Sequence, residues 1–398
     1  MWGSDGKQVD FNTYLKNVAE LRRALQEKLW SDEVTAYAEP DNLTATMMEM
    51  NINRFSFIKN VAQMYELNQA LNQSDSFSAF RSVAAGILEK FNNHWLRTEY
   101  DSAIAVAQNA AAWNRFKANK NQFPYLRYQT VGDQRVRASH AALDGKYFRI
   151  DDQSWWSLYP PNDWNCRCEM VQSSSAPAEL LTDGPGAMGL LGANYRKMKE
   201  AGFAVNRGEV KEVFDLNKAY IRQLPTSRNI DKNKLTYIDA GLQPFKKIKR
   251  TGKPHDETAS LEQIRKQFGD SAVKVYQDKS GRLLGLSKKA FEQHIKTEYT
   301  GPEEQRHTLF GSVNEVLNGY DEVWFNEDSP NRYSYRYIKF YDNSSVVVVA
   351  EVHKPAEGVV RSGNEETFQI KTWYETKENS SDMKTDDKRR GLLIEKGY

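Results

Sequence analysis

The sequence predicts a multidomain protein with a mostly α-helical N-terminal part, a small irregular α/β subdomain that contains the cysteines, and a C-terminal α+β domain with an antiparallel sheet. A chain of 398 residues is longer than one typical domain. Apolar residues recur at helical spacing in its first part, and strand-like runs separated by turn residues dominate its last part. We expect a helical region at 1–122, the subdomain at 123–222, a linker at 223–262 and the α+β domain at 263–398.

Charge and cysteine content exclude several classes of protein. Lys and Arg number 55 and Asp and Glu 53, so a nucleic-acid contact must come from a local patch of charge. The mean hydropathy of −0.74 suits long polar helices and much exposed surface. No run of about 18 apolar residues predicts a membrane-spanning helix, and the first residues lack the pattern of a signal peptide. Two cysteines cannot form a secreted disulfide framework, so we expect folding in a reducing cytoplasm.

The N-terminal region predicts three helical segments. Residues 12–30 and 54–71 both carry apolar side chains at helical spacing. The third segment starts with Ser74 or Asp75 as a plausible N-cap. No proline interrupts it before Pro124, so it predicts one very long helix or two stacked helices.

The middle of the chain changes character. Residues 125–172 are rich in Tyr, Trp, Pro, Asp and Arg, which favours a compact, irregular subdomain. Residues 173–190 have the composition of a loop, and one more helical segment is expected within 191–222. The following stretch contains "KKIKRTGKPHDE", and its polar, basic composition predicts the linker.

The C-terminal domain starts with two short strands, "KVYQD" and "LLGLS", around the turn "KSGR". Two helices follow, the first after a Ser cap at Ser287 and the second with Pro302 in its first turn. The strands "DEVWF", "YSYRYIKFY", "SSVVVVAEV" and "TFQIKTWY" complete the domain. Helices followed by an antiparallel meander are typical of the α+β class.

Cys166 and Cys168 are the only cysteines, and in an extended segment their side chains share one face. A disulfide between them would be strained. Zinc accepts thiolates at this spacing, and the nearest further ligand is His140, which leaves a fourth ligand unassigned. The alternative is two buried thiols in a Trp-rich core with His140 hydrogen-bonded nearby.

Residues 133–144 predict a helix with Asp133, Arg137 and His140 on one face. Asp133 fits there as the N-cap or as an ion-pair partner of Arg137. The pair Asp144 and Gly145 would end the helix.

These residues resemble the head-morphogenesis family of phage Mu protein F over about residues 50–222. The preceding helix and "AGFAVNRG" at 201–208 are also similar to that family. Arg135 and Arg137 bracket Val136, so either could fill the arginine position. The pattern consists of Asp133, Val136, Arg137, His140, Leu143, Asp144, Gly145, Pro160, Pro161, Asn165, Cys166, Arg167 and Cys168.

The resemblance implies a minor head protein of the virion or prohead near the portal vertex, present in the host cytoplasm during assembly. Its implied partners are the portal and major capsid proteins. The resemblance favours a structural cluster or a structural zinc at His140, Cys166 and Cys168, and it implies no catalysis there. A peptidase in this part is a weaker alternative, because the sequence lacks a Gly-framed serine nucleophile and an HExxH motif.

The strand "YSYRYIKFY" places tyrosines and Lys339 on one face. Tyrosine rings stack on bases and lysine meets phosphate, so this face suits single-stranded nucleic acid. The alternative is a half-exposed sheet whose tyrosines pack under the helices, with their hydroxyl groups reaching water.

RNA cleavage without a metal needs a general base, a general acid and cations around the phosphate. His294 and His307 are candidates for the acid and the base, although each could be only a surface or capping residue. The candidate catalytic set is His294, His307, Lys339, Thr372 and Tyr374, with Arg389 and Arg390 as nearby cations.

The order of these elements over about residues 265–398 resembles phage barnase–EndoU–colicin–RelE-like nuclease domains, which occur behind Mu F-like proteins. The resemblance implies an RNase toxin or effector without a metal cofactor, acting on RNA, with an immunity protein as a further partner. His294 would be the favoured general acid or base, and Thr372 and Tyr374 would lie in the closing strand of the site. The alternative is a purely structural, portal-associated head protein whose last domain binds nucleic acid, including packaged DNA, or head proteins without catalysis.

Overall fold

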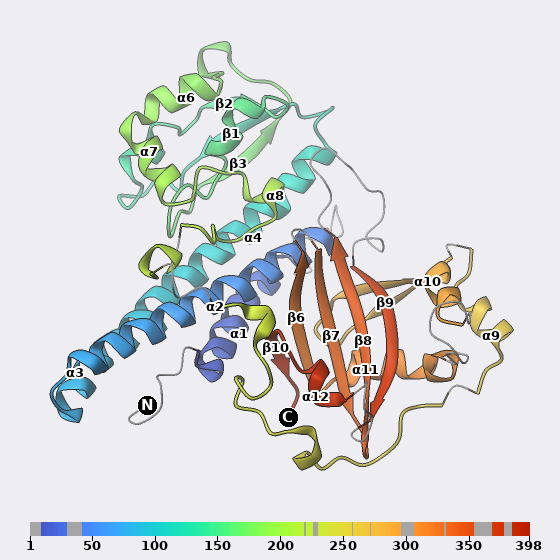
Figure 1. Cartoon of the computed structure of the whole chain (residues 1–398). Coiled ribbons are helices and arrows are strands. Elements are labelled where there is room, and N and C mark those ends of the chain that lie inside the picture. The colour runs from blue at the N-terminus through green and yellow to red at the C-terminus, as the bar shows by residue number, and fades with distance from the viewer. Residues whose placement is uncertain are drawn as a thin grey trace. The chain divides into compact units, whose positions relative to one another are not determined.

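The computed structural model describes residues 9–29, 42–218, 220–225, 230–256, 258–270, 272–295, 306–329, 332–353, 368–377 and 384–398. The chain divides into two compact units, Met1–Arg228 and Asn229–Tyr398 (Figure 1). The first unit holds a helical region and a small sheet, and the second holds a larger sheet with helices. The predicted fold class is therefore confirmed.

The helical region consists of α1 (Phe11–Leu29), α2 (Asn42–Gln73), α3 (Phe77–Glu89) and α4 (Leu96–Ala118). The π-helical turn Lys90–Trp95 joins α3 to α4, so one continuous helix runs from Phe77 to Ala118. Its N-cap is Ser76, whose hydroxyl accepts from Ala79 N at 3.2 Å. The predicted N-caps, Ser74 and Asp75, therefore lie two residues and one residue too early in the chain.

A buried core joins α1, α2 and α4, and it includes Leu21, Phe55, Val106 and Phe214. Helix α2 also carries buried polar groups. Its Lys59 pairs with Glu99 of α4 at 2.6 Å, with both side chains almost completely buried. In the part of the chain that is described, none of the helices is long and apolar enough for a bilayer crossing.

The small sheet has the strand order β2-β1-β3, and its two pairings are antiparallel. Its strands are β1 (Tyr125–Gln129), β2 (Tyr147–Arg149) and β3 (Glu169–Ser173). The core beneath it is aromatic, with Trp113, Trp155 and Tyr159 fully buried. The remaining helices of the first unit are α5 (Ala138–Ala141), α6 (Gly184–Leu191), α7 (Ala193–Glu200) and α8 (Arg207–Val210), with 3-10 turns at Gln153–Leu158, Ala178–Leu180 and Tyr220–Gln223.

A helix was predicted through residues 133–144, but the structure has only the four-residue helix α5 there. Asp133 caps a turn before it, accepting from Arg135 N at 3.0 Å. The predicted ion pair with Arg137 is wrong, because Asp133 pairs with Arg167 at 2.7 Å and Arg137 pairs with Asp163 at 3.2 Å.

The second unit is built on a seven-stranded, mostly antiparallel sheet with the order β10-β6-β7-β8-β9-β5-β4 (Figure 1). Among the strand pairs of this sheet that the structure describes, β5 with β9 is the parallel one. The predicted strands form, and β10 was not predicted. The strands are β4 (Val273–Gln277), β5 (Leu283–Ser287), β6 (Glu322–Ser329), β7 (Arg332–Phe340), β8 (Ser344–His353), β9 (Phe368–Lys377) and β10 (Leu392–Lys396).

One face of this sheet is covered by α11, which contacts β7 and β8. An aromatic cluster fills the interface, where Phe291, Phe310 and Trp373 pack with ring centroids 5.1 to 6.2 Å apart. We call this the helix-covered face. The helices of the unit are α9 (Leu261–Lys266), α10 (Lys288–Gln293), α11 (Phe310–Gly319) and α12 (Thr385–Lys388), with 3-10 turns at Lys232–Lys234, Phe245–Lys247 and Arg306–Leu309.

The tyrosines of β7 lie on the helix-covered face and are core residues. Tyr335 and Tyr337 are completely buried. Tyr337 donates to Asp278 at 3.0 Å, and the Arg282 guanidinium lies 5.6 Å from the Tyr335 ring centroid. The prediction that this face binds single-stranded nucleic acid is therefore wrong, because the turn between β4 and β5 and the helices close over it.

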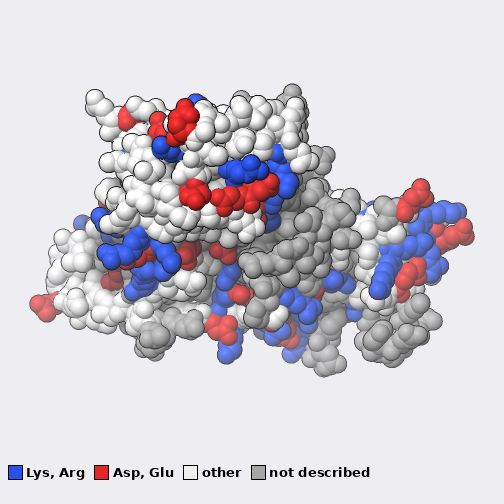
Figure 2. Space-filling model, turned by 90° about the horizontal axis from the view of Figure 1, so that it is seen from above, with Lys and Arg blue, Asp and Glu red and all other residues white. Residues whose placement is uncertain are grey.

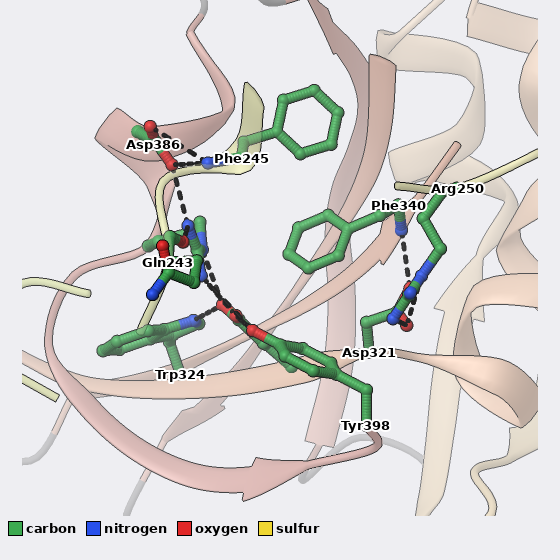
Figure 3. Close-up of polar contacts among 10 residues, drawn as sticks. Gln243, Phe245, Arg250, Asp321, Trp324, Phe340, Asp386 and Tyr398 are labelled. Carbon is green, nitrogen blue, oxygen red and sulfur yellow. Dashed lines mark hydrogen bonds and ion pairs between the residues drawn. The ribbon is translucent and has the colours of Figure 1, made fainter. Parts of the chain in front are cut away.

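Residues 230–256, most of the stretch predicted as a linker, pack on the sheet of the second unit. Gly391 N donates to Leu235 O at 2.8 Å, and Arg389 Nη1 donates to Gln243 O at 2.8 Å. Figure 3 shows that the Asp386 carboxylate accepts a hydrogen bond from Phe245 N and that Arg250 forms an ion pair with Asp321. The composition of the stretch gives no sign of these backbone contacts. On the face drawn in Figure 2, Lys and Arg lie beside Asp and Glu, in line with the near-zero net charge.

Candidate functional site

His294 follows α10, whose first turn is capped by the Ser287 hydroxyl. Its Nε2 lies 2.6 Å from Lys371 O. A carbonyl oxygen only accepts hydrogen bonds, so Nε2 carries the proton. Nδ1 lies 3.1 Å from Arg306 Nη1, which only donates. These two partners assign the neutral tautomer with its lone pair on Nδ1.

Arg306 connects His294 to strand β9. Its Nη1 also donates to Thr372 Oγ1, and its guanidinium lies 5.8 Å from the Tyr374 ring centroid. Its backbone carbonyl accepts from Trp373 Nε1 at 2.8 Å, which fixes the start of the 3-10 turn against the strand. The structure therefore brings His294, Thr372 and Tyr374 of the predicted set together around one arginine.

Thr372 and Tyr374 lie on the face of β9 opposite to Trp373, since side chains alternate along a strand. We call the half-exposed part of this face around Thr372 and Tyr374 the open face, because elsewhere α12 and Phe245 pack against it. The pairing of Thr372 with Val349 and of Val349 with Arg336 places Arg336 on this face too. Its Nη1 donates to the carbonyls of Lys388 and Arg390 at 3.2 and 3.1 Å.

Positive charge gathers around the Tyr374 phenol. Lys388 Nζ lies 5.7 Å from its ring centroid. Burial raises the pKa of Tyr374, although Arg336, Arg306 and Arg390 act against this shift. Burial and the repulsion of Arg336 and Arg390 lower the pKa of Lys388. Close cations raise each other's free energy, so the cluster is poised to receive an anion.

The Arg390 side chain is exposed and makes no hydrogen bond or ion pair with the described residues. Its neighbour Arg389 differs, because it is completely buried and paired with Glu322 at 2.6 Å. Of the two arginines that the sequence suggests, Arg390 belongs to the cationic cluster and Arg389 to the core.

Two predicted residues are not joined to this cluster. Lys339 lies on the helix-covered face, where it donates to Gly319 O at 3.0 Å. His307 neighbours Arg306 in sequence, and its Nδ1 is buried without a hydrogen-bond partner among the described residues. Strand alternation places Lys339 with the tyrosines of β7, as predicted, but it does not show that helices cover this face.

Sequence reasoning missed Arg306, Arg336 and Lys388 as members of the cluster. Strand alternation could have found Arg336, because it points away from the tyrosines of β7. The sequence around Arg306 does not indicate a role in this cluster, because Thr372 lies 66 residues away and only the fold brings the two side chains together.

The first unit holds a second cluster, at His140 of α5 and the two cysteines before β3. His140 Nδ1 lies 3.7 Å from Cys166 Sγ and 3.6 Å from Cys168 Sγ, and the three ligand atoms lie within 4.8 Å of one another. Tetrahedral zinc, with bonds of about 2.3 Å to sulfur and about 2.0 Å to nitrogen, separates such atoms by about 3.5 Å. The donor set therefore fits a soft metal ion, and all three residues are buried.

The electrostatics of this cluster favour one thiolate. The hydrogen bond from Cys168 and the nearby His140 lower the pKa of Cys166 to about 4. The hydrogen bond with Cys166, burial and the charge on Cys166 raise the pKa of Cys168. Zinc binds thiolates, so the first of the two sulfur ligands is already in its binding form.

The neighbouring ion pairs fix the geometry of the cysteine segment. Arg167, between the cysteines, forms a bidentate pair with Asp133 at 2.7 and 2.8 Å, and this lowers the pKa of Asp133 to about 2. Arg137 donates to Trp164 O at 3.0 Å. These bonds tie the segment before β3 to the loop that carries α5.

Comparison with known proteins finds two regions that match phage protein families, and each region contains one of the two clusters. Residues 43–171 match the family model "Phage Mu protein F like protein". Residues 259–394 match the family model "phage-Barnase-EndoU-ColicinE5/D-RelE like nuclease2". The chain therefore combines an N-terminal phage Mu F-like domain with a C-terminal nuclease-like domain.

Two curated proteins are similar to the Mu F-like part. The "Mu-like prophage FluMu F protein" of Haemophilus influenzae is 47% identical over 75 residues, which is 19% of this chain and 18% of that protein. The "Putative capsid assembly protein F" of Escherichia phage Mu is 33% identical over 117 residues, which is 29% of this chain and 26% of that protein. The matches thus span about a quarter or less of these relatives. No solved structure matches the chain.

Proposed function

We propose that the chain is a phage head assembly protein that carries an RNase-like effector domain. The observation that supports the effector most directly is the cluster of His294, Arg306, Thr372 and Tyr374, with Arg336 beside it. It lies within the region that matches the nuclease family. It combines a histidine base, a phenol and several cations, the groups that metal-independent RNA cleavage needs.

The proposed reaction is attack of a ribose 2′-oxygen on the adjacent phosphorus. His294 Nδ1 accepts the 2′-hydroxyl proton, the new P–O bond forms, and the bond to the 5′-oxygen breaks. Tyr374, kept protonated by its raised pKa, gives its proton to the leaving 5′-oxygen. The products are a 2′,3′-cyclic phosphate and a 5′-hydroxyl.

The arginines supply charge rather than protons in this mechanism. Arg306 donates to His294 Nδ1 and to Thr372 Oγ1 in the structure, and in this proposal the substrate phosphate binds beside its guanidinium. Guanidinium groups match phosphate oxygens in pairs, so Arg306 would transfer its bonds to the substrate and free Nδ1. Arg390 would stabilise the charge that develops on the phosphorane.

The test is cleavage of tRNA and total RNA by the full chain in the presence of EDTA. We expect cleavage by the wild type and a loss of at least about a hundredfold in His294→Ala. Lys339→Met is the matched control from the helix-covered face and is expected to cleave normally. Intact RNA in the wild-type reaction, or equal rates for wild type and His294→Ala, would contradict the proposal.

A second candidate function is nucleic-acid binding without catalysis by a purely structural head protein. The observation in its favour is that both nitrogens of His294 are engaged, one by Lys371 O and the other by Arg306. A binding domain would retain RNA or DNA in a filter assay, lose it in Arg390→Ala, and leave the nucleic acid intact.

The assembly role rests on the Mu F-like region and on its relative, the putative capsid assembly protein F of phage Mu. We propose that the chain resides in the virion near the portal vertex and contacts portal and major capsid proteins. Effector delivery with the packaged DNA and an immunity protein in the producing cell belong to the same proposal. The chain should be found in purified heads and cross-link to the portal; heads that lack it would contradict this role.

We propose zinc as a structural ion at His140, Cys166 and Cys168. It would join α5 to the segment before β3, and it supplies no catalysis. Elemental analysis should find about one zinc per chain and much less in Cys166→Ser. A wild-type protein that is fully folded yet free of zinc after purification without chelator would remove the claim.

A further inference from the structure

Residues 244–253 of the second unit carry five basic residues and no acidic one, and they lie outside the cluster around His294. Four of the basic side chains are exposed lysines that form no ion pair with the described residues. We call these four the lysine strip: Lys246, Lys247, Lys249 and Lys253. Like charges gathered in this way repel one another, so the strip favours the approach of an anion.

The backbone that carries the strip is held on the sheet. The amide of Phe245 donates to Asp386 at 3.0 Å, and the Phe245 ring lies 5.4 Å from the ring of Phe340 of β7, centroid to centroid (Figure 3). At the other end of the strip, the amide of Asp342 donates to Gly252 O at 3.1 Å. The lysines therefore project from a segment whose backbone is already ordered, which lowers the entropic cost of binding a ligand.

The strip and the proposed cleavage site share one face of the sheet. Phe340 and Arg336 point the same way along β7, and the strand pairings place Arg336 on the face of Tyr374. Ile338 pairs with Val347, and Val347 pairs with Tyr374. Two strand spacings and one side-chain repeat thus separate Phe340 from Tyr374, which is roughly 12 Å on the sheet.

Helix α12 connects the strip to the site. Its Asp386 accepts from Phe245 at the start of the strip, and its Lys388 Nζ lies 5.7 Å from the Tyr374 ring centroid. Arg390 follows directly after the helix. Cationic side chains therefore continue from Tyr374 over α12 to the lysine strip.

The acidic groups near this path are fewer than the cations. Asp321 is engaged by Arg250 at 2.8 Å, and Asp386 by Arg389 at 2.8 Å. The exposed acids that remain nearby are Asp256, Asp328, Asp342 and Asp387. The cations that form no ion pair with the described residues are Arg336, Lys388, Arg390 and the four lysines of the strip. The path therefore has an excess of positive charge, although the chain as a whole is close to neutral.

We propose that the lysine strip binds the phosphates of a single-stranded RNA whose cleaved bond lies between His294 and Tyr374. This assignment of the ligand rests on the proposed nuclease function and names its substrate, an RNA that extends several nucleotides beyond the cleaved bond on one side. Lysine ammonium groups meet phosphates as point charges and do not read bases. The strip therefore adds affinity for longer strands without a base preference.

The alternative is that the lysines only keep this surface soluble. In that case the affinity for RNA would not rise with the length of the strand beyond the site. Any other exposed lysines of the second unit would then be equivalent to those of the strip.

The test measures binding of 2′-O-methyl RNA to the full chain, because this RNA lacks the nucleophilic hydroxyl group and stays intact. We expect the wild type to bind a strand of about twelve nucleotides at least about tenfold more tightly than a strand of about four. The triple variant Lys246→Gln, Lys247→Gln and Lys249→Gln should lose this difference. Its plot of log affinity against log salt concentration should be shallower by about 2, because each phosphate contact to a single strand contributes about 0.7.

The matched control is the triple variant Lys234→Gln, Lys266→Gln and Lys289→Gln, which removes three exposed lysines elsewhere in the second unit. It loses the same charge and should bind both strands as the wild type does. Two results would overturn the proposal: a wild-type affinity that does not depend on length, or a length dependence that survives in the variant of the strip.

Cleavage of unmodified RNA by the same proteins separates this proposal from the nuclease function. Binding that depends on the strip, without any cleavage, would contradict the nuclease function and leave the phosphate-binding strip in place. Cleavage by the wild type, with equal binding of the long strand by the wild type and the variant of the strip, would overturn the strip alone.

Discussion

At the scale of single residues, the state of His294 is set by its two neighbours. The carbonyl of Lys371 holds the proton on Nε2, and Arg306 occupies the lone pair of Nδ1. The histidine itself could be predicted from the sequence as a candidate base. Arg306 could not, because its bonds to His294 and Thr372 exist only in the folded domain.

Arg306→Met should lower the kcat/KM for RNA cleavage by about a hundredfold or more, because the developing charge on the phosphate loses a preorganised cation. Lys339→Met removes a cation of the helix-covered face and should change kcat/KM little. Single-turnover rates on an RNA oligomer would measure both. Equal losses in the two variants would show that the open face is not the site of cleavage.

The pair of Asp133 and Arg167 shows how one residue contact makes stability depend on pH. The pKa of Asp133 is lowered to about 2, so the unfolded chain binds its proton at a higher pH than the folded one. The contribution of this carboxylate is therefore present above the pKa of the unfolded state, about 4, and is lost as the pH falls towards 2.

Asp133→Asn should accordingly be less stable than the wild type at pH 7, and the difference should shrink between about pH 4 and pH 2. Thermal unfolding of both proteins over this range measures it. The effect should be small, because the pair is exposed and screened by salt. A difference that stays constant down to pH 2 would contradict the assignment.

At the scale of elements, β7 shows what alternation can and cannot predict. The alternation of tyrosines with Arg336 is plain in the sequence, but it does not say which face is covered. The turn between β4 and β5 covers the tyrosine face. Its Asp278 accepts a hydrogen bond from the Tyr337 hydroxyl at 3.0 Å, and its Arg282 guanidinium lies over the Tyr335 ring.

Tyr337→Phe and Tyr374→Phe remove the same atom from opposite faces of the sheet. Tyr337→Phe should destabilise the second unit by about 1–2 kcal/mol, because Asp278 loses a buried hydrogen bond. Tyr374→Phe should affect stability less and reduce RNA cleavage strongly. Denaturant unfolding combined with the cleavage assay separates the two effects, and the reverse pattern would contradict the assignment of the faces.

Other elements could be predicted where the signal was local. Ser287 caps α10 as expected, and the strand around Trp373 forms where its composition indicates. The segment at Leu392 was too short to be predicted as a strand, yet it pairs with β6. The partner of Asp133 lies 34 residues away, so helical spacing pointed to Arg137 instead.

At the scale of the whole molecule, each unit has its own core and its own candidate site. The boundary lies near residue 228, and residues 230–256 pack on the second unit. Phe245 is almost completely buried there, and its amide donates to Asp386 at 3.0 Å. The basic composition of this stretch predicts solvent exposure, whereas its backbone groups and its few apolar side chains hold it to the sheet.

A fragment of residues 229–398 should therefore unfold cooperatively, and a fragment of residues 263–398 should have a clearly lower Tm or fail to fold. The shorter fragment loses the contacts of Leu235 and Phe245 and leaves Arg389 without the carbonyl of Gln243. Calorimetry of both fragments measures the difference. Equal Tm values would show that residues 230–256 only connect the two units.

The most direct test of the central claim is RNA cleavage by the full chain in EDTA, with the product ends identified. We predict cleavage to 2′,3′-cyclic phosphate ends, lost in His294→Ala and kept in Lys339→Met. RNA that stays intact with the folded wild type, or cleavage that is unchanged in His294→Ala, would contradict the assignment of the open face as a nuclease site.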